Sequence, residues 1–240
     1  MSEHISRKEL KQDKIKETFE HGAEAVLSHG QITIIVLLAA LLGVAGWAGW
    51  NLYHQRQTVQ ASAALDQATK AYTGRIGGAP DPSDPNEPSY PNEGARAEDA
   101  LRKFSAVADK YPHTNPGKLA RYYSALCLED LDRQNQALEE LKKISGGGDK
   151  ELSAMAQYQM GVIYSRTGKP EDAAKIYRAL AEKPTVFVPR PLVLLELARV
   201  LRQTNPQEAT NIYQQIKKEF PDPTISEEAD RGLGTLSPKT

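Results

Sequence analysis

The chain has 240 residues, of which 40% are hydrophobic and 25% are charged, and its formal net charge is −1. This near-neutral balance argues against a nucleic-acid-binding protein, which normally carries a basic patch. The single cysteine, Cys127, excludes an intrachain disulfide, so packing alone must stabilise the fold.

Residues 1–30 form a polar tail in which Leu10, Ile15 and Phe19 recur at near-helical spacing among charged residues. Two interpretations of this tail stay open. It is either a helix that lies at a membrane interface or docks on a cytoplasmic partner, or a solvated tail without a partner.

Residues 31–53 are predicted to span a membrane once. The run from Ile32 to Trp50 contains no charged residue, and about 20 apolar residues suffice to cross a bilayer. Trp47 and Tyr53 fit an aromatic belt at the far interface. A cleaved signal peptide would be shorter and would end in small residues, so we expect an uncleaved signal anchor.

The basic residues around this run predict its orientation. Positively charged flanks stay in the cytoplasm, and after the run only Arg56 precedes Lys70. We therefore expect a cytoplasmic N-terminus and a C-terminal domain outside the membrane. The basic residues of the tail are Arg7, Lys8, Lys11, Lys14 and Lys16.

Small residues at Ala39, Gly43 and Gly46 lie at helical spacing within the anchor. Small side chains let two membrane helices approach closely, so this face is a candidate packing surface for a partner helix. The alternative is that Gly and Ala are simply frequent in membrane helices.

Two segments of contrasting composition follow the anchor. Residues 54–73 are rich in helix formers and free of Pro, so we expect the anchor helix to continue to about Tyr72. Residues 74–93 are dense in Pro and Gly and are predicted to form a loop. Its acidic residues lack the spacing of a calcium-binding loop, which favours a solvated acidic segment.

Residues 94–240 read as a series of short helices separated by turns, with no alternating pattern of β-strands. The chain is therefore expected to be all-α. The predicted helices cover residues 95–111, 116–132, 134–145, 150–167, 170–182, 189–203, 206–219 and about 224–235.

An internal repeat underlies these helices. Ala137, Ala173 and Ala209 recur at a constant spacing of 36 residues. Each alanine is followed four residues later by a bulky residue, namely Leu141, Tyr177 or Tyr213. Small residues let paired helices approach closely, and one pair cannot bury its apolar face alone, so several pairs must stack into a solenoid.

The clearest copy contains Gly161, Tyr164, Gly168, Ala173 and Tyr177, and it resembles the tetratricopeptide repeat. The tryptophan that this family carries in the first helix is absent here, and the period is longer than usual. The resemblance extends over residues 95–221 and implies a solenoid of helical hairpins. The alternative is a helical bundle without repeats.

The whole layout resembles the ancillary tetratricopeptide-repeat subunits of the bacterial Sec translocon. This resemblance implies a single-pass protein of the bacterial inner membrane with a periplasmic repeat domain. It also implies a chaperone-like holdase or scaffold whose partners are translocon subunits, periplasmic chaperones or exported polypeptides. The alternative is an assembly scaffold for another envelope complex, in cell-wall or outer-membrane biogenesis.

The sequence shows no pattern of catalytic, cofactor-binding or metal-ligating residues, so we expect no enzyme activity and no small-molecule substrate. Partner binding is expected on the first helix of each pair, which lines the inner face of such solenoids. The candidate residues on these helices are Arg121, Tyr122, Tyr158, Arg190 and Arg199.

Overall fold

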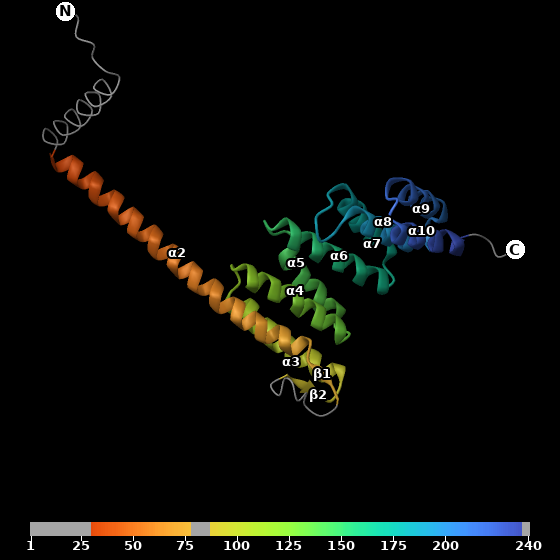
Figure 1. Ribbon diagram of the computed structural model, residues 1–240, viewed down its shortest axis with the longest axis horizontal. Coiled ribbons are helices and arrows are strands. Elements are labelled where there is room, and N and C mark those ends of the chain that lie inside the picture. Colours follow the sequence, from red (N-terminus) through yellow and green to blue (C-terminus); the bar gives the residue numbers. More distant parts are fainter. Residues whose placement is uncertain (1–29, 78–86, 237–240) are drawn as a thin grey trace, which may run out of the picture. The chain divides into compact units, whose positions relative to one another are not determined.

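The computed structural model describes residues 30–77 and 87–236 (Figure 1). Over these residues the chain is helical apart from turns and one pair of two-residue strands. The prediction of an all-α repeat fold is therefore confirmed. The predictions for the tail and for the middle of the Pro/Gly-rich loop lie outside the described residues.

Helix α2 (Gly30–Tyr72) is one unbroken helix of 43 residues. The chain divides into two compact units, of which the second begins at Gln57, so α2 contributes to both. From Ile34 to this boundary the bulky apolar side chains of α2 are exposed. After it Ala61, Ala68 and Ala71 are completely buried.

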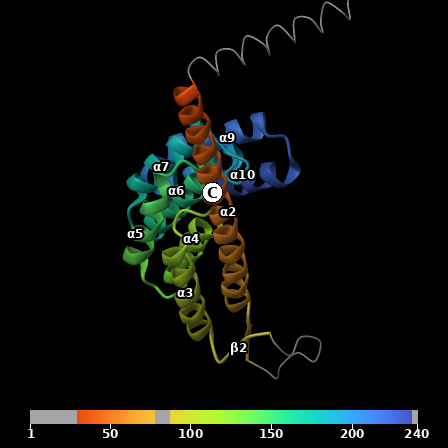
Figure 2. The same cartoon turned by 90° about the vertical axis from the view of Figure 1, so that its left-hand side faces the viewer.

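These buried alanines belong to a hydrophobic cluster shared with α3 (Glu93–Lys110). Both views show the last part of α2 beside α3 (Figures 1 and 2). The end of α2 thus supplies the first helix of the first hairpin.

Strands β1 (Arg75–Ile76) and β2 (Ser89–Tyr90) pair in parallel, within the segment that was expected to be only a loop. The Tyr90 hydroxyl donates a 2.6 Å hydrogen bond to Asp99 of α3, which ties this pair to the first hairpin. Two residues are too few for an alternating pattern, so the sequence contains no signal for these strands.

The remaining helices follow α3 and lie within two residues of the predicted ranges. They are α4 (Asn115–Asp130), α5 (Gln134–Ser145), α6 (Lys150–Arg166), α7 (Pro170–Glu182), α8 (Arg190–Thr204), α9 (Pro206–Glu219) and α10 (Pro223–Leu236). Consecutive helices contact each other along the whole series, α4 also contacts α6, and α8 also contacts α10. Hairpins α4–α5, α6–α7 and α8–α9 therefore stack in chain order, and α10 covers the last one.

Short polar side chains explain where several helices begin. Asn92, Thr114, Asp149 and Asn205 each precede a helix and accept a hydrogen bond from the N–H three residues later, at 2.8 to 3.2 Å. These bonds satisfy N–H groups that have no partner within the helix. Proline near the start of α4, α7, α8 and α9 is compatible with the same geometry, because those N–H groups need no helical partner.

The core is a row of local clusters, as expected for a solenoid. The repeated alanines Ala137, Ala173 and Ala209 are all fully buried. At Gly161 of α6, an added Cβ would lie 2.7 Å from the ring of Tyr177 in α7. Glycine at this position therefore lets the tyrosine ring fill the space between the two helices.

Candidate protein-interaction surface

Helix α4 contacts α6 and α8 contacts α10, and Tyr158 of α6 neighbours Glu196 and Arg199 of α8. The first helices of the hairpins, α4, α6 and α8, together with α10, therefore form one layer of the stack. The five candidate residues all lie on these helices: Arg121 and Tyr122 on α4, Tyr158 on α6, Arg190 and Arg199 on α8. Their surroundings differ, and only some of these residues are neighbours in the structure.

Tyr122 and Tyr158 are half-buried residues of this layer that lie near each other. Burial raises the pKa of Tyr122 to about 12, and the neighbouring Tyr123, Glu129 and Tyr158 add to this shift. Tyr122 also meets the ring of Tyr123 edge-on, with 5.8 Å between centroids. The Tyr122 side chain is therefore a neutral hydroxyl on a largely apolar ring at neutral pH.

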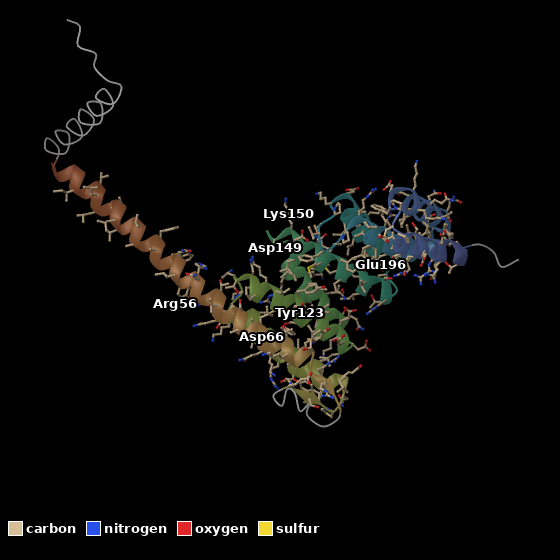
Figure 3. The ribbon with its side chains drawn as sticks, in the orientation of Figure 1. Arg56, Asp66, Tyr123, Asp149, Lys150 and Glu196 are labelled. Carbon is tan, nitrogen blue, oxygen red and sulfur yellow. The ribbon has the colours of Figure 1, made fainter. Side chains whose placement is uncertain are left out.

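Tyr158 continues this surface towards α8. Its ring lies 5.9 Å from that of Tyr177, whose buried hydroxyl has no hydrogen-bond partner among the described residues. Burial raises the pKa of Tyr158, Glu196 raises it further and Arg199 lowers it. Tyr158, Glu196 and Arg199 are thus neighbours; Glu196 is labelled on α8 in Figure 3.

Arg121 lies in a different environment. Its guanidinium donates to Glu140 of α5 at 2.7 Å and to Asp109 and the carbonyl oxygen of Ala108 at 3.3 Å. The side chain is only 17% exposed, and it lines a cavity of about 460 Å³ at the turns between hairpins. Arg121 therefore joins α3, α4 and α5 and does not lie beside Tyr158.

Arg190 also lies apart from Tyr158 and Arg199. It begins α8 and pairs with Glu219 at the end of α9, at 2.6 Å. Arg199 lies nine residues further along α8, which is about 14 Å at 1.5 Å per residue. All five residues belong to this layer, but the structure brings together only Tyr122 with Tyr158 and Tyr158 with Arg199. Arg121 and Arg190 lie at hairpin junctions.

A second cavity, which the sequence did not indicate, lies between α8, α9 and α10 and has a volume of about 190 Å³. Its charged residues are Arg199, Arg202, Arg231 and Glu228. Arg199 and Arg202 are three residues apart and share one helix face. The spacing of Arg199 and Arg202 is a weak signal in the sequence for a shared surface. Only the packing of α10 shows that Arg231 lines the same cavity.

The candidate packing residues of the predicted anchor lie on the exposed part of α2. Ala39 is exposed, and an added Cβ at Gly43 or Gly46 would meet nothing within 4 Å. This face has room for a partner helix, and its role remains a prediction.

No group of three or more His, Cys, Asp or Glu residues within residues 30–77 and 87–236 is arranged to hold a metal ion. Cys127 is buried, and burial raises the pKa of its thiol to about 12. Because the thiolate is the nucleophilic form, this thiol is not activated at neutral pH.

Comparison with protein families identifies the repeat. A family model described as a tetratricopeptide repeat-like domain matches residues 27–190, and a model described as a tetratricopeptide repeat matches residues 192–223. Among curated proteins and among solved structures, no match to the chain was found. The first match extends over the exposed part of α2 as well as the hairpins, so the apolar helix belongs to the pattern.

Proposed function

Because this chain belongs to the tetratricopeptide repeat-like family, we propose that it is a membrane-anchored, non-enzymatic scaffold that binds proteins through its stacked hairpins. Repeats of this family indicate protein partners. The observation that carries the proposal is the layer of α4, α6 and α8, in which Tyr122 neighbours Tyr158 and Tyr158 neighbours Arg199. Aromatic and Arg side chains are the residue types that dominate protein interfaces.

The membrane anchor is supported by α2. Within the described chain, this is the one helix long and apolar enough to cross a bilayer by length and composition. The apolar segment of this helix is not buried against any other part of the described chain. An exposed apolar helix of this size is unfavourable in water, and lipid removes that cost.

We further propose that the scaffold is ancillary to the Sec translocon and acts on exported polypeptides as a chaperone-like holdase. This step depends on the layout of tail, anchor and repeats. A second candidate, a scaffold for another envelope complex in cell-wall or outer-membrane biogenesis, fits the same layout. Partner identity separates the two.

In-cell photocrosslinking tests the binding surface. A photoreactive amino acid at Tyr158 or Tyr122 should trap a partner, whereas one at Lys175, exposed on the second helix α7, should not. Translocon subunits or exported polypeptides among the trapped proteins would support the Sec role, and envelope-assembly proteins would support the second candidate. Equal crosslinking from Lys175 and Tyr158 would contradict use of this layer.

Topology is tested separately with a reporter fused after Thr240. Alkaline phosphatase at this position should be active, because that enzyme folds only outside the cytoplasm. Activity of a cytoplasmic reporter at the same position would overturn both the orientation and the proposed periplasmic partners.

The anchor face is tested by replacing Gly43 and Gly46 with Leu. If small residues pack on a partner membrane helix, the bulky side chains should reduce recovery of the complex in mild detergent. Replacing Leu42 and Val44 with Ile gives a control that keeps the helix apolar. Unchanged recovery of the complex with the Leu variant would contradict a packing role.

A further inference from the structure

The turns that follow α3, α5 and α7, at residues 111–114, 146–149 and 183–189, lie together at one end of the second compact unit. The cavity of about 460 Å³ borders the first two turns, and another of about 520 Å³ borders the second and third. In the first turn the Tyr111 hydroxyl donates to Gln60 of α2 at 3.4 Å, close to the start of this unit. The turns therefore lie at the end where the chain enters the repeat domain.

The turn after α7 exposes two adjacent apolar side chains. Val186 is 82% exposed and Phe187 is 65% exposed, whereas the next residue, Val188, is buried. We call Val186 and Phe187 the apolar tip. Water solvates such side chains poorly, so an exposed apolar pair that ends a turn is a candidate contact surface.

Hydrogen bonds fix the apolar tip in place. The Glu151 carboxylate of α6 accepts from the N–H of Val186 at 3.2 Å and from that of Phe187 at 3.1 Å. The bond from Phe187 lowers the pKa of this carboxyl, and Thr185 and Val186 add to the effect. Within the turn, the Thr185 N–H donates to the carbonyl oxygen of Val188 at 3.1 Å. A tip that is already ordered loses little conformational entropy when it binds.

Lysines lie beside the apolar tip. Lys150 and Lys183 are exposed and line the 520 Å³ cavity next to Thr185, and Glu182 is the one carboxylate among its lining residues. Neither lysine forms an ion pair with any residue of the described chain. Figure 3 labels Lys150 at the start of α6. Exposed apolar and basic side chains side by side are typical of surfaces that contact lipid headgroups.

We propose that the apolar tip inserts into the headgroup region of the bilayer that holds the anchor, with Lys150 and Lys183 on anionic headgroups. The proposal rests on the membrane anchor of the proposed function and adds a second contact between chain and lipid. Two observations favour lipid over a protein partner. The tip lies at the end where the chain enters the domain, and unpaired lysines flank it; a protein partner requires neither.

Quenching of a label by lipid tests this contact in the full chain. Val186→Cys carries a bimane label, and Cys127 stays unlabelled because it is buried. The protein is placed in nanodiscs of phosphatidylcholine and phosphatidylglycerol with a nitroxide near the headgroup, with discs in large excess so that each holds a single chain. Bimane at position 186 should lose most of its fluorescence. Bimane at Gln203→Cys, exposed at the opposite end of α8, should keep it.

Variants of Phe187 locate the contact. In the chain labelled at position 186, Phe187→Ser should abolish most of the quenching. Phe187→Trp should retain it, because tryptophan also favours the membrane interface. Ile76→Ser is the matched control: it removes a 43% exposed apolar side chain from β1, which follows the other end of α2. The control should leave the quenching unchanged.

Variants of the lysines test the ionic part. Lys150→Gln combined with Lys183→Gln should reduce quenching in discs with phosphatidylglycerol but not in discs of phosphatidylcholine alone. Added salt should have the same effect, because it screens exposed charges. Lys169→Gln combined with Lys175→Gln is the control that removes equal charge from exposed positions at the start and middle of α7. Unchanged quenching with the first pair would refute the role of the lysines.

Equal quenching at positions 186 and 203, in a chain that stays with the discs, would overturn the tip contact and leave the anchor intact. Quenching that Phe187→Ser does not reduce would also overturn it. A photocrosslink in cells from position 186 to a protein, without quenching in discs, would assign the tip to a protein partner instead. A chain that elutes apart from the discs would refute the membrane anchor of the proposed function, and this proposal with it.

Discussion

Small residues at helix contacts determine how closely the hairpins pack. Gly117 lies in the first turn of α4, where an added Cβ would overlap the carbonyl oxygen of Tyr111. The Thr114 hydroxyl tightens this turn, because it donates to Tyr111 at 3.0 Å and accepts from Gly117 at 3.1 Å. A main-chain neighbour cannot rotate away as a side chain can, so this glycine has a strict steric role.

We expect Gly117→Ala to destabilise the repeat domain by about 2 kcal/mol or more, as overpacking against fixed groups does. Gly234→Ala is the control: it lies in α10 with nothing within 4 Å of an added Cβ. Ala is the better helix former by up to about 1 kcal/mol, so this variant should be neutral or slightly stabilising. Urea unfolding followed by circular dichroism compares them. Equal midpoints would show that the turn at Tyr111 adapts.

Glu140 links residue-scale charge to the stability of the fold. Burial raises the pKa of its carboxyl, but hydrogen bonds and charges from Lys143 and Arg121 outweigh burial and lower it below 4.5. A carboxyl whose pKa is lowered by folding stabilises the native state at pH values above its unfolded pKa. That contribution disappears as pH falls through the lower folded pKa.

Glu140→Gln should therefore reduce stability by up to about 1 kcal/mol at pH 7 and by less at pH 3. Glu139→Gln, which removes the same charge at the neighbouring exposed position, is the matched control. Urea unfolding at both pH values measures the difference. A deficit for Glu140→Gln that is the same at pH 3 and pH 7 would contradict the ionic origin of this contribution.

At the scale of the elements, helix starts were well predicted, because polar side chains and prolines mark them locally. Asp149 is labelled before α6 in Figure 3, and its side chain accepts from the N–H of Leu152 at 3.1 Å. The pairing of the helices was predicted from the spacing of the repeated alanines, which is also a local feature of the sequence. The strands β1 and β2 were missed, because their pairing joins residues on either side of a long loop.

Asp149→Ala should cost about 1 kcal/mol, because α6 loses the acceptor at its first turn. Asp149→Ser should recover most of this loss, since a serine hydroxyl caps helices comparably well. Thermal unfolding of the two variants gives the comparison. If the Ser variant is as unstable as the Ala variant, the negative charge and not the cap stabilises this end of α6.

At the scale of the whole molecule, the repeat domain has no single centre. Its clusters join neighbouring hairpins only, and the last cluster includes Ala229 of α10. In such a solenoid each hairpin depends on its neighbours, and terminal helices must cover the last apolar face. Helix α10 therefore protects α8 and α9 more than it protects hairpins further away.

Truncation after Phe220 removes α10 and should increase amide hydrogen exchange in α8 and α9, while α3 to α5 keep their protection. The full chain, measured in the same detergent as the truncated chain, is the reference. Uniformly faster exchange over all hairpins would show instead that the domain unfolds as one cooperative unit.

The sequence by itself determined the apolar helix, the all-α class and the period of the repeat. These features depend on residues close together in the chain, such as the alanines at 137, 173 and 209 and the uncharged run from Ile32 to Trp50. Helical geometry converts such spacing directly into buried and exposed faces.

Tertiary structure alone decided which candidate residues share a surface. It tied Arg121 to Glu140 and Arg190 to Glu219, and it brought Arg231 of α10 to the arginines of α8. These groupings join side chains about twenty to thirty residues apart, and their geometry depends on how hairpins stack. No local pattern encodes that stacking, because it is the sum of many weak packing contacts between helices.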